Sequence, residues 1–145
     1  MSCNKSAIMS QWADTIIEID TGAEVLSGST RLKAGTAEKL VLNMITTATM
    51  VKLGKVYKNY MVDMLTTNHK LRERAKKIVM ATTGIAAENQ AEALLERAEG
   101  SIKLAIVMAL TEVEREAAAK LLHDHGGFVS KAVKAMTENQ RELGV

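Results

Sequence analysis

Apolar side chains recur at steps of three and four along residues 30–56. This spacing places them on one face of an α-helix. Leu42, Met50 and Leu53 add apolar side chains on other faces, and a helix that is apolar on several faces is buried on more than one side. The pattern predicts a long core helix whose wide apolar surface also suits a subunit interface. The main face comprises Ala37, Leu40, Val41, Met44, Ile45, Ala48 and Val51.

The segment before this helix contains a short helix and one strand candidate. Residues 5–12 predict the short helix, which ends near Trp12. Residues 14–19 are β-branched and bounded by polar residues, which is typical of a strand. We find no second convincing strand in the sequence. Because one strand cannot pair its own backbone groups, this segment needs a sheet from elsewhere.

A basic helix is predicted over residues 67–82, after an irregular or extended stretch at 57–66. Thr67 is expected to cap this helix and Gly84 to close it. Its charge allows a nucleic-acid surface, but the sequence offers no interleaved aromatic residues on which bases could stack. A solvated face is the favoured interpretation. The basic residues are Lys70, Arg72, Arg74, Lys76 and Lys77.

Short helices separated by glycine are predicted for the remainder, so residues 84–136 form a compact helical subdomain. Ser101 is expected to cap one helix, and Thr111 with Glu114 has the spacing of a capping box. The predicted segments are 88–98, which ends at Gly100, a helix after Ser101, a helix after Thr111 that stops at Gly126 and Gly127, and an apolar stripe from Phe128 to Met136.

The composition fits a helical, cytoplasmic protein. The 145 residues include no proline and 3% aromatics, a mixture that favours helices. A formal charge of +2 is too small to indicate nucleic acid or an anionic membrane as partner. No apolar run approaches the roughly 20 residues that span a bilayer, and no signal-peptide pattern opens the sequence. Cys3 is the single cysteine, so no internal disulfide can form.

The stretch from residue 22 to residue 39 is the strongest candidate for a ligand site. A loop there leads into the long helix, whose first N–H groups and dipole attract anions. Ser29 and Thr30 add hydroxyls, and Arg31 and Lys33 add cations. Such a cluster suits a phosphorylated or polyhydroxylated ligand. On chemistry alone, capping of the helix by Ser29 or Thr30 is the favoured interpretation.

Glu24 precedes this loop and has two interpretations. Its carboxylate could accept hydrogen bonds from sugar hydroxyls, or it could cap a turn or balance Arg31. Elsewhere, His123 and His125 flank Asp124 at a predicted helix C-terminus, where histidine interacts with the dipole. Without a fourth ligand in view, we predict no metal site there. His69 is expected on the surface. A nucleophilic role for Cys3 would need a partner base, and the sequence identifies none.

The string GSTRLKAGTAEK at residues 28–39, followed by LVLNMITTATMVKLGKVYKNYMVDM and then TNHKLRERAKKIV, closely resembles the N-acetylmuramic acid 6-phosphate etherases. These belong to the sugar-isomerase (SIS) domain superfamily, and the regulatory protein of vertebrate glucokinase is a distant relative. The resemblance runs from Ser2 to Val129 but concerns the C-terminal half of the family protein. One local departure is Ala23, where the family usually has proline.

The resemblance implies a mainly α fold. It would comprise the C-terminal part of an α/β SIS fold, with one residual strand and a long interface helix, followed by a small helical subdomain that resembles ubiquitin-associated domains. We expect residues 1–66 to be the remnant of the sugar-phosphate-binding domain and residues 67–145 the helical subdomain. A homodimer through the long helix is also expected.

The resemblance implies cleavage of the lactyl ether of N-acetylmuramic acid 6-phosphate, without metal or nucleotide cofactors. The family's two catalytic glutamates lie in its N-terminal half, so no catalytic residue is carried over and the chain alone should be inactive. The carried-over residues that border the sugar-phosphate pocket are Glu24, Ser29, Thr30 and Lys33. Two alternatives stay open, namely a non-catalytic sugar-phosphate-binding regulator and a helical protein-interaction module.

Overall fold

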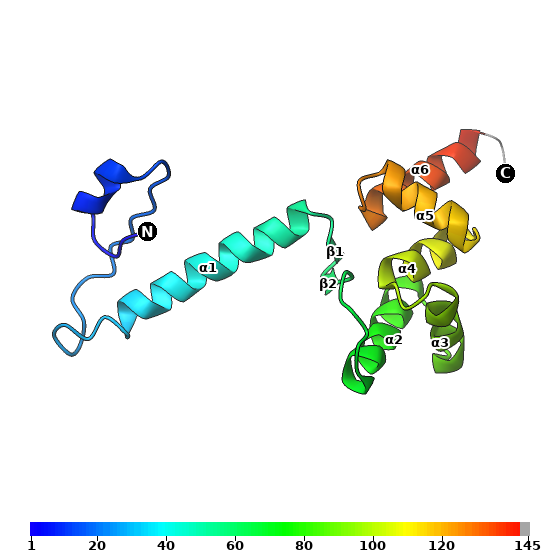
Figure 1. Ribbon diagram of the computed structural model, residues 1–145, viewed down its shortest axis with the longest axis horizontal. Helices are drawn as coiled ribbons and strands as arrows, with labels where there is room; N and C mark the ends of the chain where they lie inside the picture. Colours follow the sequence, from blue (N-terminus) through cyan, green and yellow to red (C-terminus); the bar gives the residue numbers. More distant parts are fainter. Residues whose placement is uncertain (143–145) are drawn as a thin grey trace. The chain divides into compact units, whose positions relative to one another are not determined.

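The computed structural model describes the backbone of residues 1–142 and the side chains of residues 1–138. This part of the chain is mainly helical, as predicted (Figure 1). It divides into two compact units, unit 1 from Met1 to Thr49 and unit 2 from Met50 onward. The elements are the 3-10 helix η1 (Ile8–Trp12), α1 (Lys33–Lys52), β1 (Val56–Tyr57), β2 (Tyr60–Met61), α2 (His69–Thr83), α3 (Glu88–Arg97), α4 (Ile102–Thr111), α5 (Arg115–Asp124) and α6 (Val129–Glu142).

Helix α4 is the centre of unit 2. It contacts α2, α3, α5 and α6 (Figure 1), and this burial on several sides explains why the helix is apolar around its circumference. Thr111, at its buried end, donates its hydroxyl to the carbonyl of Val107 at 2.7 Å, so no polar group is left unpaired there. The buried residues of α4 are Ile102, Ala105, Ile106, Val107, Met108 and Thr111.

A short hairpin precedes α2, within the stretch predicted to be irregular or extended. β1 and β2 are antiparallel and joined by Lys58 and Asn59, and Lys58 has φ 54°. The hairpin has no clear signature in the sequence, because this turn has no glycine. Val62 follows with 1% exposure, which anchors the hairpin in the core of unit 2. The paired residues are Val56 with Met61 and Tyr57 with Tyr60.

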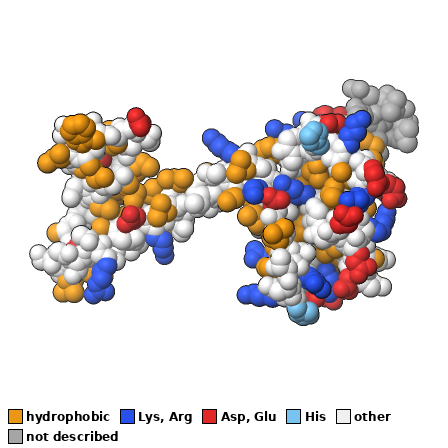
Figure 2. All heavy atoms as spheres, viewed as in Figure 1, with side chains coloured by type: hydrophobic (Ala, Val, Ile, Leu, Met, Phe, Trp, Pro, Cys, Tyr) orange, Lys and Arg blue, Asp and Glu red, His pale blue; other side chains and the backbone are white. Residues whose placement is uncertain are grey.

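Unit 1 has almost no core of its own. Val41 is the one buried residue among residues 1–49, and Trp12 is 86% exposed. Figure 2 shows hydrophobic side chains across the surface of this unit. Apolar side chains exposed in this way usually mark interfaces. The large exposed ones are Met1, Ile8, Met9, Trp12, Ile16, Val25, Leu26, Leu40, Leu42, Met44 and Ile45.

The strand predicted over residues 14–19 does not form. This segment makes one parallel bridge, between Ser2 and Glu18. The backbone N–H of Ser2 donates to Ile17, and that of Ile19 donates to the carbonyl of Ser2, each at 2.9 Å. The β-branched sequence favours an extended backbone, but a ladder needs a second strand. Unit 1 supplies only the bridge at Ser2, so the extended segment remains unpaired beyond it.

Helix α1 is shorter than the predicted 30–56. It begins at Lys33, because residues 30–32 form turns, and it ends at Lys52, two residues before Gly54 with φ 67°. The short helix predicted over 5–12 is the 3-10 turn η1. The sequence therefore indicated both helices, whereas their ends are set by turns that periodicity does not register.

Two predicted helix caps are wrong. Asn68, not Thr67, caps α2, and its side chain accepts a hydrogen bond from the N–H of Leu71 at 2.9 Å. Thr111 and Glu114 form no capping box, because Thr111 is the last residue of α4 and Glu114 precedes α5 without a side-chain cap.

Two other helix-end predictions are confirmed. Ser101 caps α4 by accepting from the N–H of Leu104 at 3.4 Å, and Gly84 closes α2 with φ 83°. No helix among residues 1–142 is both long and apolar enough to cross a membrane.

Candidate functional site

Glu24 caps helix α1 from nine residues upstream. Its two carboxylate oxygens accept the N–H groups of Lys33 at 2.9 Å and Ala34 at 3.0 Å. These hydrogen bonds, the one from Ala34 foremost, hold the pKa of Glu24 below its ordinary value. Arg31 makes no ion pair within the described residues. Glu24 therefore caps the start of a helix rather than the expected turn, and in this part of the chain it does not pair with Arg31.

The N–H groups at the start of α1 are all occupied by the chain itself. Beyond the two that Glu24 binds, Gly35 donates to the carbonyl of Thr30 at 2.8 Å, and Thr36 donates to Leu32 at 3.0 Å. The sequence predicts free N–H groups here for an anion, and that expectation is wrong. A carboxylate from within unit 1 already occupies the position that favours negative charge.

The hydroxyls of Ser29 and Thr30 remain available. Within the described residues neither side chain makes a hydrogen bond, so neither caps α1. Their backbones form the turns that lead into the helix, where Thr30 N–H donates to Gly28 and Leu32 N–H to Ser29. Ser29 is half-buried and Thr30 is exposed. The geometry therefore leaves two hydroxyls that could donate to a ligand.

Lys33 is held against the loop by its own side chain. Its ammonium donates to the carbonyl of Ala23 at 2.8 Å, which leaves two of the three ammonium hydrogens free. A backbone carbonyl makes this bond, so it does not depend on the side chain of residue 23. Lys33 also borders a shallow, mainly apolar hollow of about 540 Å³, whose lining is Thr21, Leu32, Lys33, Thr36, Ala37 and Leu40.

The four predicted site residues therefore fall into two groups. The carboxylate of Glu24 accepts the backbone N–H of Lys33, so these two residues are in contact. Ser29 and Thr30 lie in the preceding turns and do not line the hollow beside Lys33. The capping role of Glu24 was not predictable from local motifs, because known cap patterns span about three residues rather than nine.

Glu18 has a role in unit 1 that parallels that of Glu24. Its carboxylate accepts the N–H groups of Ser6 at 2.8 Å and Ala7 at 3.0 Å, at the entry to η1. The hydroxyl of Ser10 also donates to it, and this bond is the main cause of the lowered pKa of Glu18. A general acid near neutral pH needs a raised pKa. Neither Glu18 nor Glu24 is therefore suited to that role.

The histidines near the end of α5 make local contacts. The Nδ1 atom of His125 lies 2.8 Å from the carbonyl of Leu121, whereas His123 and Asp124 are exposed. The described residues contain no group of three or more histidine, cysteine or acidic side chains placed to hold a metal ion. His69 is on the surface as predicted, with 90% of its side chain exposed.

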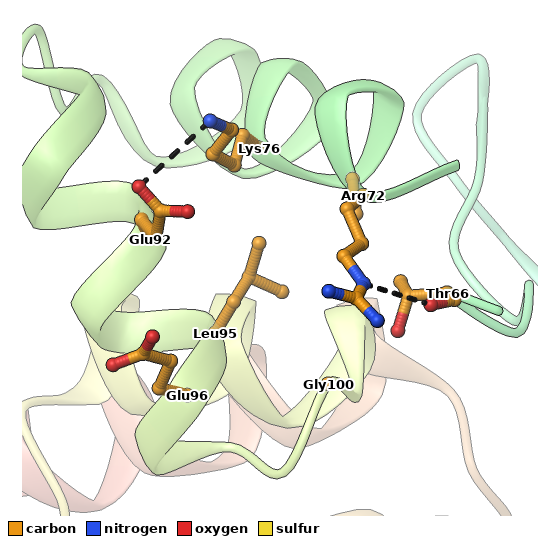
Figure 3. A pocket seen from close by; sticks show the side chains of 8 residues that line it. Thr66, Arg72, Lys76, Glu92, Leu95, Glu96 and Gly100 are labelled. Carbon is orange, nitrogen blue, oxygen red and sulfur yellow. Dashed lines mark hydrogen bonds and ion pairs between the residues drawn. The ribbon is translucent and has the colours of Figure 1, made fainter. Parts of the chain in front are cut away.

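The sequence predicts a solvated basic face on α2. In the structure, part of this face is covered. Lys76 is only 12% exposed and its ammonium lies 2.8 Å from the carboxylate of Glu73. Lys76 and Arg72 line a pocket between α2 and α3 (Figure 3). Periodicity could not reveal this pocket, because one wall comes from α2 and the other from the separate helix α3.

Comparisons with known proteins address the family resemblance. The chain is 55% identical over 134 residues to an N-acetylmuramic acid 6-phosphate etherase of Geobacillus thermodenitrificans, covering 92% of this chain and 45% of that protein. It is 56% identical over 133 residues to the protein of that name from Bacillus cytotoxicus, and 54% to that from Bacillus cereus, with the same coverage. By sequence, the chain is a relative of the N-acetylmuramic acid 6-phosphate etherases. No protein-family model matches it.

The extent of this match qualifies what it implies. The chain spans about half the length of the curated relatives it matches, and the match lies on their C-terminal half. The resemblance to the C-terminal portion of the etherase family is thereby confirmed. Glu24, Ser29, Thr30 and Lys33 stay predictions as substrate-binding residues.

Proposed function

We propose that this chain provides the C-terminal, sugar-facing portion of an N-acetylmuramic acid 6-phosphate etherase. The complete enzyme would be a lyase that cleaves the lactyl ether to N-acetylglucosamine 6-phosphate and D-lactate in cell-wall sugar recycling. The observation that carries this proposal is the 55% identity over 92% of the chain to a protein of that name. The family's catalytic acid and base would come from a segment equivalent to the N-terminal half of the relatives.

The loop before α1 would form one wall of the sugar-phosphate site. Ser29 and Thr30 would donate their free hydroxyls, and Lys33 its two free ammonium hydrogens, to phosphate or sugar oxygens. Each oxygen of Glu24 accepts one N–H and keeps a second acceptor direction for a sugar hydroxyl. Glu24 would then cap the helix and bind sugar at the same time, so the two interpretations of this residue are compatible.

The exposed apolar surface of unit 1 supports the same proposal. Residues 1–66 would complete a SIS domain together with the N-terminal half, and the extended segment at 14–19 would join its sheet. Residues 67–145 would be the helical subdomain, similar to ubiquitin-associated domains. The apolar faces of α1 would also support a homodimer, and the enzyme would act in the cytoplasm.

The test is an assay of D-lactate released from N-acetylmuramic acid 6-phosphate. The chain would be assayed alone and together with the separately produced N-terminal half of the Geobacillus thermodenitrificans relative. We expect no release by the chain alone, because a general acid and a general base each contribute about 10²–10⁴-fold. D-lactate release should be detected when both parts are mixed, and the intact relative serves as the positive control.

Two results would contradict this proposal. Lactate release by the chain alone would show that it carries an acid and base of its own. An inactive mixture, in which the chain still binds N-acetylglucosamine 6-phosphate, would favour a non-catalytic regulator. Substituting Ser29→Ala and Thr30→Ala together should weaken activity of the mixture, whereas Lys77→Gln, an exposed change on α2, should not.

A further inference from the structure

A pocket in unit 2 is lined by residues of α2 and α3, together with Thr66 and Gly100. It has a volume of about 330 Å³ between α2 and α3, near the lower end of the roughly 300–1,000 Å³ typical of small-molecule sites. Its apolar part comes from Ala75, with 0% exposure, and Leu95, with 8%. Figure 3 shows the Leu95 side chain pointing into the space between the charged side chains. The pocket therefore combines an apolar surface with charged groups at its edges.

Arg72 forms the basic side of the pocket. Its Nε donates to the carbonyl of Thr66 at 3.4 Å, which holds the guanidinium beside the end of the hairpin segment. Its two terminal nitrogens make no hydrogen bond or ion pair within the described residues, so they remain free to bind a carboxylate with two hydrogen bonds. Gly100 closes this end, since a Cβ there would lie 2.9 Å from the Thr66 hydroxyl.

Glu92 and Glu96 form the acidic side, one helical turn apart on α3. Lys76 is already matched by Glu73 at 2.8 Å and lies 3.8 Å from Glu92. Glu96 makes no ion pair among the described residues. Figure 3 shows the two glutamates and Arg72 on opposite sides of Leu95. Arg72 and Glu96, neither of them ion-paired among the described residues, thus line one pocket at its two ends.

We propose that this pocket binds a small zwitterion, namely a dipeptide or amino acid with free amino and carboxyl groups. The carboxylate would bind Arg72, the ammonium would bind Glu96 and Glu92, and a small apolar side chain would contact Leu95. A phosphate or other simple anion would face both glutamates, and a simple cation would face Arg72 and Lys76. A ligand with both charges satisfies both ends, and like-charge contacts exclude the others.

The probe is alanyl-alanine, titrated into the isotope-labelled full chain while backbone amide shifts are recorded. Two matched probes block one charge each, N-acetyl-alanyl-alanine and alanyl-alanine amide. We expect shifts confined to the ends of α2 and α3 and to residues near Gly100, with a Kd on the order of 1 mM. Each blocked probe should bind roughly tenfold more weakly, because it cannot make one of the two charge-assisted contacts.

Variants distinguish the two ends of the pocket. Arg72→Gln should weaken alanyl-alanine roughly tenfold and remove its preference over the amide, and Glu96→Gln should remove its preference over the acetylated probe. Lys77→Gln removes a positive charge from the same helix and should leave binding unchanged. Circular dichroism of each variant checks folding. Arg72→Lys keeps the positive charge but lacks the two parallel N–H donors of the guanidinium, so it should bind alanyl-alanine with intermediate affinity. Equal binding of all three probes, shifts outside the pocket, or no saturation at about 20 mM would overturn the proposal.

Discussion

Carboxylates of unit 1 replace the local caps that its sequence suggested. Glu24 binds the first two N–H groups of α1, and Glu18 binds two N–H groups before η1. Ser29 and Thr30, which precede α1 and have the usual cap chemistry, do not cap it. A single sequence reveals local caps through spacing, but it cannot reveal a residue that reaches a helix from nine or eleven positions away.

The role of Glu24 predicts a dependence on pH at the start of α1. Because the pKa of Glu24 is lower in the folded chain than its ordinary value, ionised Glu24 stabilises the helix start above about pH 4.3. This contribution is lost as the pH falls from there through the folded pKa. A pH titration of the Ala34 amide shift should report the transition, with smaller protection factors against amide exchange at Lys33 and Ala34 in acid.

Glu24→Gln should remove this titration from the Ala34 amide and speed its exchange several-fold at neutral pH. Glu38→Gln, an exposed change on the same helix, is the matched control and should preserve the titration. If the Ala34 amide titrates equally in both variants, Glu24 is not the cap of α1 in solution.

Gly54 predicts a large steric effect at a single residue. It is buried with φ 67°, and a Cβ there would lie 3.1 Å from two ring carbons of Phe128 and 3.2 Å from the carbonyl of Gly127. Gly54→Ala should lower the free energy of unfolding of unit 2 by about 2–4 kcal/mol, from backbone strain and overpacking together.

Gly84→Ala is the control for the backbone part of that effect. Gly84 has φ 83° but nothing within 4 Å of a new Cβ, so its cost should be limited to about 1 kcal/mol. Urea unfolding of the two variants would measure the difference. Equal losses would mean that Phe128 moves away without cost.

At the scale of elements, the apolar pattern together with glycines and capping residues predicted the α-helices of the described residues, and the capping residues and glycines located several of their ends. It failed where pairing or sequence-distant contacts decide the structure. Residues 14–19 have strand composition but lack a partner, and the hairpin at 56–61 has a partner but lacks a glycine turn. The cap of α2 was misplaced by one residue because Thr67 and Asn68 are both good capping types.

The corrected cap of α2 gives a direct test. Asn68→Ala removes the side-chain acceptor for the N–H of Leu71 and should cost about 1 kcal/mol of unfolding free energy. Thr67→Ala, one residue earlier, should change it by less than about 0.5 kcal/mol. Urea unfolding of both variants measures the pair. A larger loss from Thr67→Ala would restore the assignment that the sequence suggested.

At the scale of the molecule, the two units differ in how completely each buries its apolar residues. Unit 2 surrounds α4 on several sides, whereas unit 1 buries Val41 alone among residues 1–49. The sequence therefore predicted the helices of unit 2, but neither its hairpin nor the cap of α2. The candidate sugar-phosphate site could be placed by motif but not built, because its residues lie in the unit with almost no buried core.

The exposed faces of α1 predict that the chain self-associates. Leu42, Met44 and Ile45 are 54%, 61% and 49% exposed, and burying them against a second copy would remove apolar surface from water. Sedimentation at tens of micromolar, roughly the range for weak interfaces, should show a dimer.

Replacing Leu42→Glu and Ile45→Glu together should shift the dimer to monomer, since two carboxylates would be desolvated in the contact. Leu65→Glu, at a position 78% exposed in unit 2, is the control and should leave the dimer intact. A monomer for the unchanged chain, or equal dissociation by Leu65→Glu, would rule out an interface centred on α1.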